Sequence, residues 1–288
     1  MISLRPVQSA LRLSGALCAG ALLLLAHPGF ALAQGRLDAR YEATLAGIPV
    51  GKGAWTIDIS DDQFTAAASG GTAGLLKAFA GGTGTGASQG RVVNGALLAT
   101  NYSASTTTSK KTEVIHMVLS GGNVREYGID PVPPVDPERI PLTDAHRRGV
   151  FDPMTGSMLR VPGSGDPLSP EACRTSAAIF DGRMRYDLKL DYKRMETVKA
   201  EKGYQGPVVV CAVYFDPIAG HIPSRAAIRY VAKQRDMEVW LAPIAGTRML
   251  VPFRAQGPTP IGLGIVEATY FVSSPLPSRA SAGGINIR

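Results

Sequence analysis

Apolar and polar residues alternate in several short segments of the chain. The clearest run spans residues 183–190, where every second side chain is apolar, and residues 55–59 alternate in the same way. A period of two is typical of a half-buried β-strand. β-Branched and aromatic residues favour further strands at 114–119, 208–215, 226–231, 237–241 and 264–272. Glycine and proline separate these runs at short intervals.

Helix signals are few. Asp152 precedes Pro153, which places a capping side chain before a proline at the first helical position and predicts about two turns over residues 154–160. Ser169 and Pro170 repeat this arrangement. The chain has no repeat of fixed period, which argues against solenoids and propellers. The pattern therefore predicts a mainly β fold, a large curved antiparallel sheet or partly open β-barrel with one or two short helices.

The N-terminal residues have the features of a cleaved signal peptide. Arg5 and Arg12 precede an apolar run over residues 13–26, and Ala31 and Ala33 supply small residues for cleavage after Ala33. The apolar run is shorter than the roughly 20 residues that a membrane-spanning helix needs. We therefore expect no transmembrane anchor in the mature form and a periplasmic or otherwise exported location. The predicted organisation is a signal peptide (1–33), a single β-rich domain (34–274) and a flexible C-terminal tail (275–288).

Two cysteines remain after the predicted cleavage, Cys173 and Cys211. An even pair in an oxidising compartment is most simply a disulfide. Two buried free thiols are the alternative.

The charge of the mature chain is mildly basic. Removing the two arginines of the predicted signal from the formal charge of +7 leaves +5. Such an excess would favour contact with anionic envelope material such as lipid head groups or lipopolysaccharide, although a solvated surface is the better explanation because the arginines are dispersed. The possible partners are a lipid, lipopolysaccharide or an envelope protein. The densest basic clusters, at residues 110–111 and 146–148, are not interleaved with aromatic residues. A nucleic-acid partner is therefore not expected.

Four segments together resemble the exported family known as domain of unknown function 3108. They are YEATLAGIPVGKGAW (41–55), FDPMTGSMLR (151–160), CRTSAAIFDGRMRYDLKLDY (173–192) and GPTPIGLGIVEATYF (257–271). The similarity spans residues 40–273. The resemblance implies an envelope-located, predominantly antiparallel β protein, and it carries over no catalytic or ligand residues.

One motif suggests a serine nucleophile. Residues 86–90 match G-x-S-x-G, in which Ser88 would have to lie at a strained turn between a strand and a helix. The residues that follow predict a strand instead of that helix. Because His116, His146 and His221 all follow Ser88, the order of the residues alone does not exclude a triad.

The same glycine-rich segment contains a loose dinucleotide fingerprint at residues 82–87, but no acidic residue follows at the required distance. A flexible loop or a glycine-rich edge strand explains the segment better. Asp144 with His146, and Asp216 with His221, are isolated pairs without further metal ligands nearby in the sequence. We therefore predict no catalytic residues, no cofactor and no metal site.

The remaining candidate is a pair of arginines. Asp181 and Gly182 predict a turn that leads into the alternating strand, from which Arg183 and Arg185 project on one face. On a concave sheet they would be the first candidates to contact an anion, whereas an exposed sheet face would have the same pattern.

Three functions are consistent with the sequence. The first is a non-enzymatic binding or envelope-assembly protein for an amphipathic envelope component or a partner protein. The second is an envelope hydrolase acting on glycan or ester bonds. The third is an assembly factor that acts through an exposed sheet edge.

Overall fold

The computed structural model describes residues 34–74 and 81–276. Within these ranges the chain forms one sheet. Its strands are β1 (Gly35–Leu45), β2 (Ile48–Ile59), β3 (Gln63–Thr72), β4 (Gly82–Val93), β5 (Ala96–Thr108), β6 (Thr112–Ser120), β7 (Asn123–Asp130), β8 (Leu159–Arg160), β9 (Thr175–Phe180), β10 (Arg185–Lys199), β11 (Lys202–Gly203), β12 (Gln205–Ala219), β13 (Glu238–Pro243), β14 (Met249–Thr259) and β15 (Gly262–Pro275). The helices are α2 (Pro153–Gly156), α3 (Ala226–Lys233) and the 3-10 turns η1 (Asp144–Arg147) and η2 (Pro170–Cys173).

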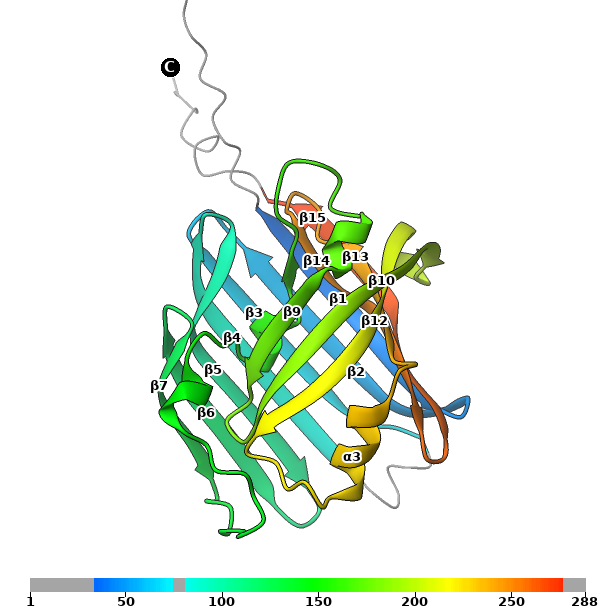
Figure 1. Ribbon diagram of the computed structural model, residues 1–288. Helices are drawn as coiled ribbons and strands as arrows, with labels where there is room; N and C mark the ends of the chain where they lie inside the picture. Colours follow the sequence, from blue (N-terminus) through cyan, green and yellow to red (C-terminus); the bar gives the residue numbers. More distant parts are fainter. Residues whose placement is uncertain (1–33, 75–80, 277–288) are drawn as a thin grey trace, which may run out of the picture. The chain divides into compact units, whose positions relative to one another are not determined.

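The sheet is antiparallel apart from the short pairing of β11 with β15, and β8 joins it by pairing with β14. Its main order is β7-β6-β5-β4-β3-β2-β1-β15-β14-β13-β12-β10-β9. Figure 1 shows how it curls, so that β9, β10 and β12 lie across from β2 to β5. The prediction of a large curved antiparallel sheet is therefore confirmed.

The two ends of the sheet, β7 and β9, approach each other without forming a ladder. The backbone N–H of Val150 donates to Gly122 O (2.8 Å), and that of Phe151 donates to Ala178 O on β9 (2.8 Å). The rings of Tyr127 on β7 and Phe180 on β9 meet edge to face at 5.3 Å. A short segment and one aromatic pair thus close the sheet where strand pairing stops.

Alternation along the strands builds the core inside this curve. The register places Ile57 on β2 beside Ala66 on β3, and Met117 on β6 beside Tyr127 on β7. Ile57, Ala66 and Met117 are buried with Leu37 and others in the main hydrophobic cluster, and the partly buried Tyr127 packs against it. The outward positions carry the polar residues, as the period of two requires.

The helix α2 lies inside the curve and packs against both walls. Asp152 caps it by accepting from the backbone N–H groups of Met154 and Thr155, at 3.0 Å each. Trp55 Nε1 on β2 lies 3.1 Å from Met154 Sδ. On the other wall, a Cβ added to Gly156 would lie 2.2 Å from Ile179 Cδ1, so only glycine fits this contact.

A disulfide joins Cys173 on η2 to Cys211 on β12. Both cysteines are fully buried in a second hydrophobic cluster, together with Val209, Val239 and Leu241. The pair that the sequence predicts to be bridged is thus bridged in the structure, and it attaches η2 to the wall formed by β12 and β13.

Three local predictions were wrong. Residues 226–231 form the helix α3 instead of a strand, because the basic residues recur at helical spacing and the apolar ones share the opposite face. The glycine-rich segment is β4, a central strand between β3 and β5, where Gly86 leaves room for Met154. The helix after Asp152 is one turn long instead of two.

The predicted signal peptide, with cleavage after Ala33, lies outside the described residues, as do positions 277–288 of the predicted tail. None of the helices in the described part of the chain is long and apolar enough to span a membrane.

Candidate functional site

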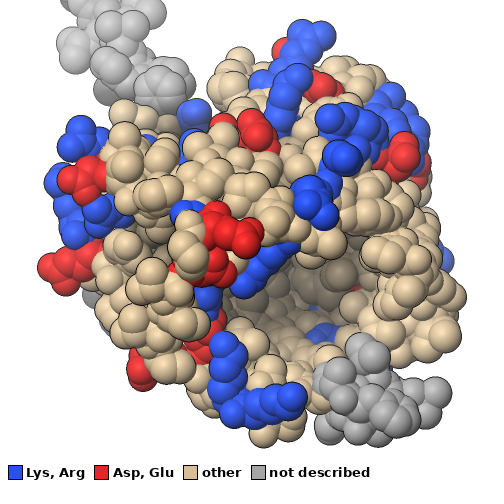
Figure 2. Space-filling view, turned by 60° about the horizontal axis from the view of Figure 1, so that its bottom comes forward, with Lys and Arg blue, Asp and Glu red and all other residues tan. Residues whose placement is uncertain are grey.

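A cavity of about 600 Å³ lies inside the curled sheet, between the β9–β10–β12 wall and the β1–β15–β14 wall. Figure 2 shows the hollow opening at one end of the molecule. Most of its lining is apolar. The lining side chains include Ala43, Leu45, Leu159, Ala177, Leu188, Leu190, Val213, Met237, Val239, Leu241, Ala255 and Val266.

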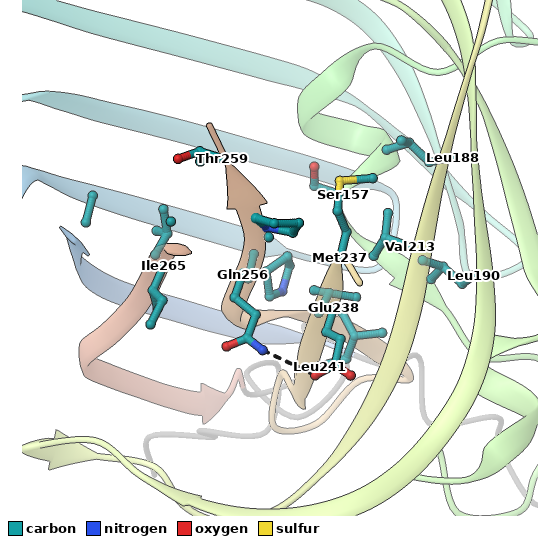
Figure 3. Close-up of a pocket in the computed structure, with 18 of the residues that line it drawn as sticks. Ser157, Leu188, Leu190, Val213, Met237, Glu238, Leu241, Gln256, Thr259 and Ile265 are labelled. Carbon is teal, nitrogen blue, oxygen red and sulfur yellow. Dashed lines mark hydrogen bonds between the residues drawn. The ribbon is translucent and has the colours of Figure 1, made fainter. Parts of the chain in front are cut away.

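The strand register explains why these side chains converge. Leu190 on β10 lies opposite Val213 on β12, and Val266 on β15 lies opposite Ala255 on β14. Figure 3 shows Leu188, Leu190 and Val213 along one side of the space and Ile265 across from them. Unlike the core near α2, this end of the interior is not filled, and Val266 is 44% exposed within it. An apolar wall that faces open space loses packing and transfer free energy until something covers it.

The cavity continues along β2 and β3. A neighbouring hollow of about 450 Å³ shares Ala43, Pro252 and Val266 with it and extends to Trp55. The added wall consists largely of small residues, which are Gly51, Gly53, Ala54, Ala68, Ser69 and Gly71. Small side chains leave this part of the interior empty, and the two adjoining hollows suit an elongated occupant.

An ion-pair network lies beside the cavity. Arg194 on β10 reaches across β12 and donates two hydrogen bonds to Glu238 on β13, at 3.0 Å each. Lys193 Nζ lies 2.6 Å from the same carboxylate. Gln256 Nε2 lies 3.4 Å from it, at the position drawn in Figure 3. These donors hold the pKa of Glu238 down at about 2, although its burial works in the opposite direction.

This network predicts a defined acid response. Because the folded pKa of Glu238 lies below its ordinary value of 4.5, its stabilising effect is complete above pH 4.5 and is lost as the pH falls towards about 2. Solvent screening of the partly exposed cations limits the contribution to about 2 kcal/mol. Urea unfolding should show wild type losing stability between pH 5 and pH 2 more steeply than Glu238→Gln. Parallel pH profiles for the two proteins would show that the network does not stabilise the fold.

The family model described as Protein of unknown function (DUF3108) matches residues 40–269. The chain belongs to this family. The resemblance seen in the sequence is thereby confirmed. The cavity lies within the matched residues, as does the curved sheet apart from the start of β1 and the end of β15.

Among solved structures, the crystal structure of a beta-barrel-like protein of domain of unknown function DUF1849 from Brucella abortus is similar to the chain. It is 9% identical, the match covers 85% of this chain and 99% of that one, and the TM-score is 0.44. No curated protein matches the chain.

In this DUF3108 protein, Ser88 is buried in the middle of β4. Its hydroxyl donates to Asp152 Oδ2 (3.1 Å) and lies 3.0 Å from Thr155 Oγ1. These contacts attach the sheet to the cap of α2. A nucleophile has to reach the substrate from a sharp turn, and Ser88 lies in a paired strand beneath a helix.

Two carboxylates near Ser88 have raised pKa values. Burial raises the pKa of Asp152 and of Asp181, against the hydrogen bonds that each accepts. Burial, together with both carboxylates, raises the pKa of the Tyr102 phenol far above its usual range. Perturbed carboxylates often indicate catalysis. Here Asp152 caps α2, and Asp181 accepts from the N–H groups of Arg183 and Met184 in the β9–β10 turn, so structural roles account for both.

The two arginines predicted to contact an anion are both engaged within the chain. Arg183 forms an ion pair with Glu113 on β6, which links the β9–β10 turn to the opposite end of the sheet. Arg185 Nη1 lies 2.8 Å from Asp187 Oδ1 on the same strand. Any anion at this position would have to compete with these carboxylates.

The sequence pattern did not predict the cavity. Its lining combines ordinary strand positions from distant segments, and the alternation of residues 183–190 only shows that Leu188 and Leu190 share a face. One usable signal was present. Residues 43–51 and 255–266 contain no charged residue, and both contribute to the cavity wall.

Proposed function

We propose that this exported DUF3108 protein is a non-enzymatic binding protein that holds an apolar chain, such as the hydrocarbon part of an amphipathic envelope molecule, inside its curled sheet. The observation that carries the proposal is the open apolar cavity of about 600 Å³. Its volume lies in the range of small-molecule sites, and its lining suits a hydrocarbon. The predicted signal peptide and the disulfide support an oxidising, exported location.

The chemistry of the walls sets the class of ligand. Facing side chains such as Leu188, Leu190 and Val266 offer dispersion contacts and no charge. The polar groups of the lining include Thr259 at the end of β14 and Gln256, which is bonded to the carboxylate of Glu238. A ligand with an apolar tail and a polar head would bury the tail among the leucines and keep the head at the open end. Burial of the tail supplies the affinity.

The test is binding of the apolar dye N-phenylnaphthylamine, followed by its fluorescence in a detergent-free solution. Val266→Asp should weaken the binding roughly tenfold or more, because a bound hydrocarbon would strip water from the new carboxylate. Val266 is half-exposed, so this substitution should leave folding intact.

Val118→Asp is the matched control. Val118 is a valine on β6 with similar exposure, 38%, and it does not line the cavity. It should bind the dye as wild type does. Equal affinity for wild type, Val118→Asp and Val266→Asp would place the dye outside the cavity and overturn the proposal.

The alternative of an envelope hydrolase receives no support from Ser88, whose hydroxyl is buried and bonded to Asp152. The alternative of an assembly factor that works through a sheet edge is weakened at β9, because part of that edge is already bonded to Phe151.

A further inference from the structure

Among the described residues, the four most exposed large hydrophobic side chains lie in or directly beside connections at one end of the sheet. They are Val135 (98% exposed), Val132 (84%), Ile261 (72%) and Ile48 (58%). Ile48 begins β2 after the β1–β2 turn, Ile261 lies in the β14–β15 turn, and the two valines follow β7. Antiparallel pairing from β15 through β1 to β7 puts these three connections at the same edge.

Two of these turns touch each other. The backbone N–H of Ala46 donates to Leu263 O (2.9 Å), and Gly262 approaches Ala46 so closely that an added Cβ would lie 2.7 Å from the alanine Cβ. Ile48, Ile261 and the half-exposed Leu263 are therefore exposed on one pair of touching turns. These turns stand beside the cavity, because Leu45 and Thr259 from the same hairpins line the wall.

The helix α3 gives this end a positive charge. Between Pro217 and Arg235 the chain has four basic residues, Arg225, Arg229, Lys233 and Arg235, and no acidic one. All four are exposed. The helix is at the same end as the valines, because Ile140 N–H donates to His221 O (2.9 Å) just before it. After it, Met237 lines the cavity and contacts Gly257 on β14.

Figure 2 views this end and shows lysine and arginine side chains around the hollow, with acidic side chains along one side of it. Lys110 and Lys111 in the β5–β6 turn are exposed at the same edge. Protruding apolar side chains beside basic ones form the pattern of a surface that lies in the interface of an anionic bilayer, where the apolar groups enter the acyl boundary and the cations meet the head groups.

We propose that this end of the protein docks on an anionic lipid bilayer, with Ile48, Ile261 and Val135 inserted and α3 on the head groups. The cavity mouth then faces the membrane. The docking surface lies outside the cavity, so this inference is separate from ligand binding, although together they describe a protein that would exchange its ligand with a bilayer. Charge favours an anionic surface over a neutral protein partner as the occupant, since the four exposed cations outnumber the acids beside them, which are Asp236 next to Arg235 and Glu138 in contact with Ser224.

The test is flotation of residues 34–288 with vesicles of phosphatidylethanolamine and phosphatidylglycerol, compared with vesicles of phosphatidylcholine alone. Wild type should bind the anionic vesicles and should be released from them by salt. The triple variant Ile48→Ser, Ile261→Ser and Val135→Ser should bind at least roughly tenfold more weakly. Arg229→Gln with Lys233→Gln should lower the affinity roughly fivefold per charge on anionic vesicles only.

Val93→Ser is the control, since Val93 is a 41% exposed valine at the β4–β5 turn, on the opposite edge. It should float as wild type does. Two results would overturn the proposal: wild type that fails to bind anionic vesicles, or a triple variant that binds like Val93→Ser. A wild type that dimerises in solution and stays off vesicles, with a monomeric triple variant, would identify the end as a self-association surface instead. Dye binding in vesicle-free solution tests the cavity separately, so either proposal can fail alone.

Discussion

Replacing Asp152 with alanine is expected to lower the free energy of unfolding by about 3 kcal/mol, measured by urea denaturation. The carboxylate is fully buried and accepts from the N–H groups of Met154 and Thr155 and from the Ser88 hydroxyl. Alanine would remove the helix cap and leave these donors buried without partners. Because Gly156 at the end of α2 lines the cavity, dye binding should weaken as well.

Asp152→Asn is the matched control for this prediction. Its amide oxygen can still cap α2, so most of the stability should be kept. Wild type and Asp152→Asn should also differ in the pH dependence of their free energy of unfolding. Burial raises the folded-state pKa of Asp152, so the stabilising effect of the protonated form is complete below the unfolded value of 3.8 and is lost as the pH rises through the folded value. As the pH rises from 3.8 through the folded-state pKa of Asp152, wild type should therefore lose stability relative to Asp152→Asn. A variant Asp152→Ala as stable as wild type would contradict the role assigned to the cap.

The second large effect concerns the disulfide. Replacing both Cys173 and Cys211 with alanine should cost about 4 kcal/mol on the chain-entropy model, because the bridge closes a loop with a sequence separation of 38. The loss should appear as a lower urea midpoint. It should also loosen the wall of the cavity, since Cys211 on β12 lies opposite Val239, which lines the wall.

Wild type treated with dithiothreitol supplies the control for the double variant. Reduced wild type and the alanine variant should unfold at the same urea concentration, and the reductant should leave the variant unchanged. A loss below about 1 kcal/mol in the double variant would show that the bridge adds little to a chain already held by the sheet.

Strand positions were predictable because the period of two is a local property of the sequence. The alternation of residues 183–190 locates the start of β10 and shows which side chains share a face. The same reasoning failed at residues 226–231, where aromatic and β-branched content outweighed a basic repeat of helical spacing. The glycines of β4 favour a loop or an edge strand in the sequence pattern, because the side chain that packs against Gly86, Met154 of α2, comes from a distant segment.

The cavity and the cluster around Asp152 depend on contacts between distant segments, so the sequence pattern could not predict them. Nothing near Ser88 in the sequence shows that its hydroxyl donates a hydrogen bond to Asp152, 64 residues later. Likewise, Arg183 meets Glu113 only because the sheet curls until its two ends approach. The disulfide was an exception, because only Cys173 and Cys211 remain after the predicted signal cleavage, and two cysteines allow only one pairing.

Native mass spectrometry of the purified protein after incubation with a total lipid extract from a bacterial envelope tests the central claim most directly. The account predicts one amphipathic molecule bound per chain to wild type and to Val118→Asp, and a much smaller bound fraction for Val266→Asp. Wild type that retains its unliganded mass in the extract, or that carries the same adduct as Val266→Asp, would contradict a binding site in the cavity.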